Sequence, residues 1–365
     1  MKILIDNIIF GIQNSGGISV VWYELLKRLL YDAEFELKVI DFNNQKNIFR
    51  KMLEIPKKAI ITNSLGKFPI NIQRFLNPNI SCKGGIFHST YYRIINDPSI
   101  INVTTVHDFT YEYYRKGLPG LLHQYQKGAA INNSKKIICV SENTKRDLIS
   151  FYPKINDKKI KVIYNGVNTA YKILDNNPGD LVKSLVPYSQ GEYILYVGER
   201  RVKYKNFRLA VEACRILRMP IVMVGGGPVT DQEKSFMKFK LEKNNFFFHP
   251  HITNESLNIL YNNAFCLLYP SSHEGFGIPI IEAQKSGCPV ICSSCSSIPE
   301  VAGNGALYLK KIDTESIIEA IKTIDHNSAK RNEIIHIGIK NANKFSWDQC
   351  YQQTKELYEE LYHEN

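Results

Sequence analysis

The alternation of short apolar runs with longer amphipathic stretches constrains the fold of this chain more than any other feature. In the first half, the apolar runs predict strands at 2–5, 37–41, 86–88, 103–107, 136–140 and 161–164, with helices at 20–30 and 143–151. The second half predicts strands at 193–197, 221–224, 246–249, 266–269 and 290–292, and helices at 207–217, 231–241, 255–262, 279–285 and 314–324. Strands that alternate with helices favour parallel sheets. We therefore expect an α/β protein with two doubly wound, Rossmann-like sheets.

The length of 365 residues suits two domains better than a single core. Residues 171–190 are polar and rich in turn-forming residues, so we place a linker there. This predicts an N-terminal Rossmann-like domain over 1–170 and a C-terminal one over 191–343. Residues 344–365 predict a helix that fits against either domain. Ligands of such folds bind where strands end, which predicts a central cleft between the two domains.

The segment from His273 to Pro289 carries the strongest functional signal. Glu274 and Glu282 are separated by a glycine-rich loop and by Pro279, a residue that suits the first turn of a helix. We therefore expect Glu274 on a loop and Glu282 in the first turns of the next helix. A helix start favours phosphate, and a carboxylate accepts hydrogen bonds from the neighbouring hydroxyls of a sugar. The segment thus predicts a site for a sugar diol, a diphosphate and a second diol, which are the parts of a nucleotide sugar.

This segment resembles the Glu-x7-Glu motif of glycosyltransferase family 4, a family of retaining transferases with the GT-B fold. The resemblance covers almost the whole chain, with its motifs in the family's order. It is also carried by residues 14–19, 87–90, 105–108, 140–144, 164–167, 196–200, 205–207 and 224–228. The resemblance implies retention of the anomeric configuration. It also implies that the last helix crosses back to the first domain.

Two cations near a strand end are candidates for binding the diphosphate. Arg200 and Lys205 follow the Val-Gly turn at Gly198 and can neutralise the charge that builds on the leaving phosphate. Family members often place the lysine one position closer to the glycine, so Arg201 and Lys203 are further candidates. No metal-binding pair of acidic residues follows a strand at a matching place, so we expect no metal and no other cofactor.

The other predicted contacts come from both halves of the chain. Gly17 belongs to a glycine pair that lets the backbone approach a ligand before the first long helix. A histidine at the position of His107 faces the donor sugar in the resembled family, so we expect His107 to bind a hydroxyl there. His88 and His273 are weaker candidates.

The acidic segment is expected to bind the donor along its length. Glu274 should bind hydroxyls of the transferred sugar, and Glu282 should bind the ribose diol. The remaining donor-binding residues are predicted to be Gly198, Gly275, Phe276, Gly277 and Ile278.

The eight cysteines are scattered, and the first strand reaches a charge at Asp6, so the start of the chain does not predict a signal peptide. No apolar run reaches the roughly 18 residues that a membrane-spanning helix needs. We expect reduced thiols and a cytoplasmic protein. Cys288, Cys292 and Cys295 lack a fourth ligand at a usual spacing, so we interpret them as buried thiols rather than a zinc site.

The charge is uneven along the chain. Residues 1–182 carry 25 Lys and Arg against 15 Asp and Glu, which is most of the formal net charge of +11. A basic region favours an anionic partner. We prefer a peripheral contact with the inner face of a membrane, where a lipid-linked acceptor would lie; ordinary solubility charge is the alternative. No RNA- or DNA-binding motif accompanies the charge, so no nucleic acid is expected.

These observations predict a glycosyltransferase that moves a hexose from a nucleotide-diphosphate sugar to a hydroxyl of a lipid-linked or oligosaccharide acceptor. Likeness to mannosyltransferases of bacterial surface polysaccharide and lipopolysaccharide assembly favours GDP-mannose, and a UDP-sugar is the alternative. A nucleotide-sugar 2-epimerase would need acid and base groups beside C2, and no further carboxylate pair suits that role. The complete set of Arg200, Lys205, Glu274 and Glu282 argues against a third reading, a non-catalytic sugar-binding protein.

Overall fold

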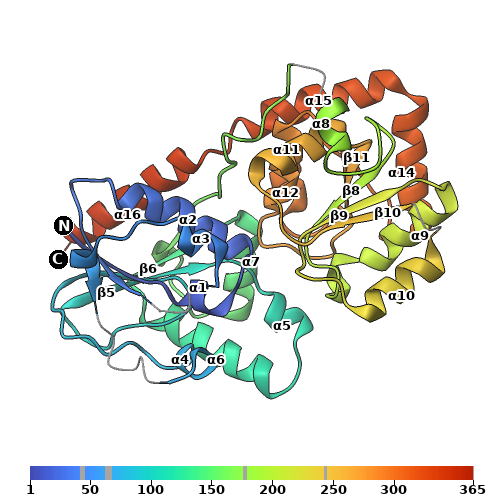
Figure 1. The fold of residues 1–365 in the computed structure, drawn as a ribbon. Helices are drawn as coiled ribbons and strands as arrows, with labels where there is room; N and C mark the ends of the chain where they lie inside the picture. The colour runs from blue at the N-terminus through green and yellow to red at the C-terminus, as the bar shows by residue number, and fades with distance from the viewer. Residues whose placement is uncertain (42–45, 62–67, 176–178, 242–244, 365) are drawn as a thin grey trace. The chain divides into compact units, whose positions relative to one another are not determined.

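The computed structural model describes residues 1–41, 46–61, 68–175, 179–241 and 245–364. They form two compact units, which we call the N-terminal unit (Met1–Asn165 with Trp347–Asn365) and the C-terminal unit (Gly166–Ser346). Each unit is a parallel sheet with helices on both of its faces (Figure 1). The prediction of two doubly wound α/β sheets is therefore confirmed.

The boundary between the units falls earlier than the predicted one. The first segment of the N-terminal unit ends at Asn165, whereas the sequence analysis ended the first domain at residue 170. Within the proposed linker at 171–190, residues 176–178 lie outside the described part of the chain, and Gly179–Lys183 forms the short helix α8.

Seven strands make up the sheet of the N-terminal unit, in the order β3-β2-β1-β4-β5-β6-β7. They are β1 (Lys2–Asp6), β2 (Glu36–Ile40), β3 (Ile60–Ile61), β4 (Gly85–Ser89), β5 (Ile100–Val106), β6 (Lys136–Cys139) and β7 (Ile160–Val162). The order reverses between β1 and β4, which makes this the switch point of the sheet. The two-residue strand β3 was not predicted, because so short a run has no recognisable pattern.

The helices of the N-terminal unit lie on both faces of its sheet (Figure 1). They are α1 (Ile8–Ile12), α2 (Gly17–Leu29), α3 (Ile48–Lys51), α4 (Ile70–Gln73), α5 (Thr110–Tyr114), α6 (Leu118–Asn133), α7 (Glu142–Phe151) and α16 (Trp347–His363). Helix α6 is the longest that the sequence analysis missed.

Helix α16 follows the whole C-terminal unit in sequence but packs on α2 and β4 of the N-terminal unit. Its buried Tyr358 lies with its hydroxyl 2.7 Å from Nδ1 of His88, and Nε2 of the same ring lies 2.8 Å from the Thr105 hydroxyl. At the surface, Arg28 donates to Asp348 at 2.8 Å. These contacts give His88 a structural role in the core, since both of its ring nitrogens are occupied.

The C-terminal unit has a six-stranded sheet in the order β10-β9-β8-β11-β12-β13. Its strands are β8 (Ile194–Val197), β9 (Ile221–Val224), β10 (Phe246–His249), β11 (Cys266–Tyr269), β12 (Val290–Cys292) and β13 (Leu307–Tyr308). Besides α8, its helices are α9 (Phe207–Leu217), α10 (Asp231–Lys240), α11 (Asn254–Asn263), α12 (Ile278–Lys285), α13 (Ile298–Ala302), α14 (Thr314–His326) and α15 (Ser328–Ala342). The switch point of this sheet lies between β8 and β11.

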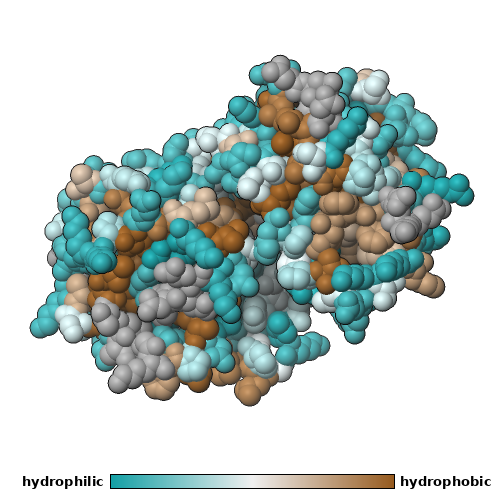
Figure 2. All heavy atoms as spheres, viewed as in Figure 1, coloured by the Kyte–Doolittle hydropathy of each residue, from teal (hydrophilic) through white to brown (hydrophobic). Residues whose placement is uncertain are grey.

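The surface is mostly hydrophilic in the view of Figure 2, with hydrophobic side chains gathered in separate patches. No helix among the described residues combines the length and the apolar content needed to cross a bilayer.

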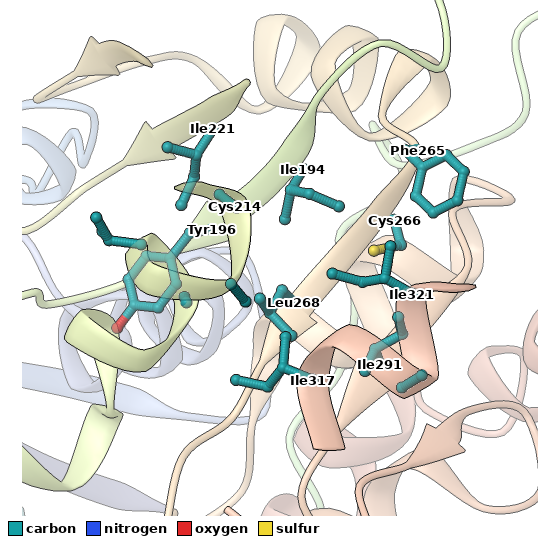
Figure 3. Close-up of a cluster of buried hydrophobic side chains, with 14 of the residues drawn as sticks. Ile194, Tyr196, Cys214, Ile221, Phe265, Cys266, Leu268, Ile291, Ile317 and Ile321 are labelled. Carbon is teal, nitrogen blue, oxygen red and sulfur yellow. The ribbon is translucent and has the colours of Figure 1, made fainter. Parts of the chain in front are cut away.

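A buried apolar core holds the sheet of the C-terminal unit against α9, α10, α14 and α15 (Figure 3). Alternate residues of the strands point to the same face, as Ile194 and Tyr196 do on β8. They pack against Cys214 of α9 and against Ile317 and Ile321 of α14. Because strands buried on both faces have little freedom to shift, the loops at their carboxyl ends are carried on a rigid base.

Candidate active site

The loops that follow β8 and β11 lie at the switch point of the C-terminal sheet, where doubly wound folds bind ligands. The first loop runs from Gly198 to a 3₁₀ turn at Lys203–Lys205, and the second contains Glu274. Asn206 ties the two loops together, because its side-chain amide donates to the Pro270 carbonyl at 2.8 Å and to the Ser272 hydroxyl at 2.7 Å. Asn206 thus fixes the loop that carries its neighbour Lys205 beside the loop that carries Glu274.

Lys205 and Glu274 form an ion pair at this switch point. The Lys205 Nζ lies 2.5 Å from the Glu274 Oε1 and 3.4 Å from the Tyr269 hydroxyl. The side chains retain 14% and 11% exposure, so both charges remain accessible to a ligand. The structure therefore brings together one predicted cation and one predicted carboxylate that are far apart in sequence.

The loop that carries Glu274 is held by two serines at the start of α13. The backbone N–H of Glu274 donates to the Ser296 hydroxyl at 2.8 Å. The Ser297 hydroxyl lies 2.9 Å from the carbonyl oxygens of both Glu274 and Phe276. The Phe276 ring is buried and packs edge-on against Phe345. Such fixed loops can present backbone N–H groups to a ligand without reorganisation.

Helix α12 begins directly after this loop, with Gly277 at its N-cap and Pro279 in its first turn. Gly277 has a φ of 109°, which favours glycine, and as the N-cap residue it offers no side chain to the N–H groups of this helix start. No acidic residue lies in the first turn either, so the partial positive charge of the helix start is not neutralised locally. The predicted places of Glu274 on the loop and Glu282 in the helix are confirmed.

Glu282 lies on α12 and is partly buried. The Tyr261 hydroxyl donates to its Oε2 at 3.1 Å, whereas the Tyr171 hydroxyl donates to Asn254 Oδ1 at 3.2 Å. Burial raises the pKa of Glu282 to about 7, an effect that the hydroxyls of Tyr261 and Tyr171 partly offset. The carboxylate therefore changes charge within the physiological pH range.

Arg200 does not face the solvent in this structure. Its Nε lies 2.9 Å from Oε1 of Glu233 on α10, and its guanidinium also donates to the carbonyls of Gly225 and Gly227. The guanidinium lies 4.0 Å from the centre of the Phe248 ring, and the side chain is 1% exposed. In this conformation Arg200 organises the loop after β9, and its predicted contact with a diphosphate would require it to leave these partners.

The alternative candidates at this loop are more exposed. Arg201 pairs with Glu199 at 2.7 Å and donates to the Gly226 carbonyl at 2.5 Å. Lys203 lies in the same 3₁₀ turn as Lys205. Of these basic residues, Lys205 is the one that the structure places beside Glu274.

Two of the predicted residues, His107 and Gly17, belong to the N-terminal unit. His107 follows β5 and is buried, and its Nε2 has no hydrogen-bond partner within the described part of the chain. Burial lowers the pKa of His107 to about 4, so the ring is neutral at pH 7. Gly17 is the first residue of α2, and a Cβ placed on it would meet no atom within 4 Å.

The switch point of the N-terminal sheet holds a saturated ion pair instead of an accessible one. Asp6 at the end of β1 accepts from Arg93 at 2.6 and 2.8 Å, and both side chains are fully buried. Its carboxylate also accepts from the Ser89 hydroxyl and from the Ile8 N–H. This carboxylate has no oxygen left for a ligand.

The eight cysteines are all free, and most of them are buried, including Cys288 and Cys292. Within the described ranges no group of three or more His, Cys, Asp and Glu side chains is arranged to hold a metal ion. His273 is buried beside Glu274.

Several residues of the site carried no signal in the sequence. Tyr171 and Tyr261 contact Glu282 but are distant from it along the chain. Ser296 and Ser297 follow the cysteine cluster, and Glu233 belongs to the N-terminal capping box of α10. Only the capping box has a sequence signature, Thr-x-x-Glu, and it marks a helix start rather than a site.

Two family models match the chain, one in each half. The model described as Glycosyltransferase Family 4 matches residues 15–171, and the model described as Glycosyl transferases group 1 matches residues 180–341.

Curated relatives match over most of the chain. O-antigen chain mannosyltransferase B of Escherichia coli is 27% identical over 277 residues, which cover 71% of this chain and 70% of the relative. The O-antigen chain mannosyltransferase RfbU of Salmonella typhimurium is 31% identical over 235 residues, which cover 62% of each chain.

Solved structures of low sequence identity share the fold. Sucrose-phosphate synthase from Thermosynechococcus elongatus has a TM-score of 0.80 at 16% identity, with both chains fully covered. Anabaena HepE in complex with UDP-glucose has a TM-score of 0.76 at 17% identity, covering 99% of this chain and 100% of HepE. WaaG, a glycosyltransferase involved in lipopolysaccharide biosynthesis, has a TM-score of 0.72 at 14% identity, covering 98% of this chain and 99% of WaaG. These likenesses confirm the GT-B fold class.

Proposed function

Because the chain belongs to glycosyltransferase family 4, we propose that it transfers a hexose from a nucleotide-diphosphate sugar to a hydroxyl of a lipid-linked or oligosaccharide acceptor in surface glycan synthesis. GDP-mannose is the favoured donor, since the two curated relatives are named as O-antigen mannosyltransferases. A UDP-sugar is the alternative donor, because the similar HepE structure contains UDP-glucose.

One observation carries this proposal: Lys205 and Glu274 meet at the switch point of the C-terminal sheet, directly before the open start of α12. A cation, a carboxylate and a helix start within one loop pair match the charges and hydroxyls of a sugar diphosphate. Glu282, farther along the same helix, then suits the second diol of the ligand.

Each residue has a proposed role in binding the donor. Glu274 accepts hydrogen bonds from hydroxyls of the transferred sugar, and Glu282 accepts them from the ribose diol. Lys205 neutralises the diphosphate, joined by Arg200 if the guanidinium leaves Glu233. The backbone donor-binding positions are Gly17, Gly198, Gly275, Phe276, Gly277 and Ile278. His107, as a neutral ring with an available Nε2, binds a hydroxyl of the donor sugar.

The proposed reaction retains the configuration at the anomeric carbon. The bond between that carbon and the leaving phosphate oxygen breaks, and a bond to the acceptor oxygen forms on the same face. The leaving phosphate takes the proton of the acceptor hydroxyl, so Glu274 acts as a binding group rather than as a nucleophile. Negative charge on the phosphate grows as the bond breaks, and Lys205 with the start of α12 stabilises it.

We further propose that the reaction needs no metal ion. The positive charge that a metal would supply at the diphosphate comes from Lys205 and from the N–H groups at the start of α12. The transfer rate should therefore survive treatment with a chelator.

The acceptor is proposed to lie at the inner face of a membrane, where the basic first half of the chain meets anionic lipid. Residues 1–182 carry 25 Lys and Arg against 15 Asp and Glu, which supports this partner.

A donor panel tests the proposal. A ligand that binds the folded state raises the melting temperature. At a concentration of 100 times its Kd, it raises the free energy of unfolding by about 2.7 kcal/mol. We expect GDP-mannose or one UDP-sugar to stabilise the protein and to release nucleoside diphosphate when a membrane extract supplies acceptors. A 2-epimer as product would assign an epimerase, and binding without turnover would assign a non-catalytic protein. The proposal fails if no nucleotide sugar shifts the melting temperature.

A further inference from the structure

The first half of helix α6 carries its apolar side chains on the outside of the N-terminal unit. Leu118, Leu121, Leu122 and Tyr125 lie at the spacing of one helical face, and their exposed fractions run from 44% to 80%. Over this first half of the helix the buried positions are Gly120 and the polar residues His123, Gln126 and Lys127, while Ala130 and Ile131 are buried farther along. This is the reverse of the usual arrangement in a surface helix.

Polar contacts fix the helix in this orientation. The fully buried Lys127 lies 2.8 Å from the Glu112 carboxylate and donates to the Asp108 carbonyl at 2.9 Å. The His123 ring stacks on Tyr111 at 3.8 Å between ring centres, and its Nε2 lies 3.0 Å from the Tyr91 hydroxyl. Rolling α6 to bury its leucines would expose these groups or leave a buried charge without its partner. The outward apolar face is therefore a fixed property of the unit.

The exposed face continues onto α5. We call the exposed side chains of Tyr113, Tyr114, Leu118, Leu121, Leu122 and Tyr125 the apolar ridge. Figure 2 shows hydrophobic residues at the lower edge of the N-terminal unit, where Figure 1 places α6. Ile72 and Phe75 at α4 are exposed as well, and α4 is joined to α6 by a hydrogen bond from Gln126 to the Arg74 carbonyl.

The charges within the ridge are positive. Arg115 and Lys116 lie in the turn between α5 and α6 and are exposed, and no acidic residue occurs from Tyr113 to Tyr125. The turn is tight, because a Cβ on Gly120 would collide with the Arg115 carbonyl oxygen. The nearest acids are engaged: Glu112 pairs with Lys127, and Asp147 accepts from the Tyr113 hydroxyl at 2.9 Å.

We propose that the apolar ridge is a membrane-docking surface that inserts into the interfacial region of a bilayer containing anionic lipid. Tyrosines and leucines beside Arg and Lys are the residue types that this region accommodates, with rings and alkyl groups below the lipid headgroups and cations at the phosphates. A twofold contact with a second copy is disfavoured, because it would bring Arg115 and Lys116 close to their own counterparts. The inference deepens the membrane contact proposed above and rests on it for the identity of the acceptor.

Vesicle flotation with the full chain tests the ridge. We expect binding to vesicles of phosphatidylcholine with phosphatidylglycerol at 0.15 M salt, and weaker binding to phosphatidylcholine alone. The double substitution L121S/Y125S should reduce the vesicle partition coefficient at least about tenfold, because two inserted side chains are lost. The double substitution R115Q/K116Q should remove most of the preference for anionic vesicles.

Matched controls are Y31S in the N-terminal unit and F239S in the C-terminal unit, each at a side chain more than 80% exposed and outside the ridge. Both should bind vesicles like the unchanged protein.

Melting curves of each variant establish that it is folded. The inference is overturned if the unchanged protein does not float with anionic vesicles, or if L121S/Y125S floats equally well. It is also overturned if light scattering shows a dimer that this variant converts to a monomer, since the ridge would then be an interface between copies. Flotation needs no donor, so a protein that binds vesicles but transfers no sugar would contradict the proposed function and leave the ridge standing.

Discussion

The two sheets have the same kind of switch point but use its polar groups in opposite ways. In the C-terminal unit, Lys205 and Glu274 meet there with their charges partly exposed. In the N-terminal unit, Asp6 and Arg93 meet at the equivalent place and are fully buried. The same topology therefore supports either a ligand contact or a structural ion pair.

The difference arises in the segments that follow the strands. After β4, the chain returns Arg93 to the Asp6 carboxylate, and further donors from Ser89 and Ile8 saturate it. After β11, two serines hold the loop of Glu274 by its backbone and leave its side chain to Lys205. Sheet order selects the place for a site, and the loop decides whether the polar groups there remain available.

The largest expected effect is on the buried pair. R93M leaves the Asp6 carboxylate buried without its partner, which should destabilise the N-terminal unit by about 3–5 kcal/mol. Both tryptophans, Trp22 and Trp347, belong to this unit, so tryptophan fluorescence during urea unfolding reports on it selectively. The double variant D6N/R93M should recover part of the loss. If R93M changes the free energy of unfolding by less than about 1 kcal/mol, the ion pair does not stabilise this switch point.

The pair of Lys205 and Glu274, which keeps some exposure, should affect turnover instead of folding. K205A removes the cation that faces the diphosphate, and we expect an about 100- to 1,000-fold lower rate of nucleoside diphosphate release with little change in melting temperature. The matched control is K203A, in the same 3₁₀ turn, which should stay within about threefold of the unchanged enzyme. Equal losses in both variants would mean that the positive charge of the turn matters, and not the Lys205–Glu274 geometry.

The pKa of Glu282 gives the next effect. Its pKa is raised to about 7, and the ionised carboxylate is the form that accepts both ribose hydroxyls, so donor affinity should rise with pH through about 7. At pH 6 the affinity should be about tenfold below its plateau at pH 8. Calorimetric titration with the identified donor measures this.

Two variants separate this assignment from a general effect of pH. E282Q should bind the donor weakly, and its affinity for the donor should not change with pH near 7. Y261F removes a hydrogen bond that favours the carboxylate and should move the step to higher pH. An unchanged step in E282Q would assign it to another group.

The smallest expected effect concerns Arg200. E233Q weakens one of the contacts that turn the guanidinium inward, while the carbonyls of Gly225 and Gly227 and the Phe248 ring remain. If Arg200 joins the diphosphate, the KM for the donor should fall about threefold at unchanged kcat, because the introduced amide still accepts a neutral hydrogen bond and only the charge is lost. A lower melting temperature with an unchanged KM would instead assign Arg200 to holding the loop after β9.

The strands could be predicted closely, because buried parallel strands are short apolar runs bounded by polar residues. Val103–His107 was predicted and Ile100–Val106 is observed, which is typical of the differences at strand ends. Helix α6 could not be predicted in the same way, because in its first half the apolar side chains face outward and polar side chains are buried. Helix α15 contains Gly338 and several isoleucines without a clear helical period.

The site could be predicted in part. Motif order and strand order together place Lys205 near Glu274, and Pro279 locates the helix that carries Glu282. The direction of the Arg200 side chain could not be predicted, because its partner Glu233 lies on a helix that no motif connects to it. The tyrosines beside Glu282 and the serines beneath Glu274 likewise come from distant elements.

The position of α16 has a consequence for synthesis of the chain. During translation, all of Gly166–Ser346 leaves the ribosome before Trp347–His363 does. The C-terminal unit is contiguous, so it has every one of its residues while the unit that was made first still lacks a covering for His88 and β4. The C-terminal unit can therefore complete its fold from one continuous stretch of chain, whereas the N-terminal unit is complete only once Trp347–His363 has been made.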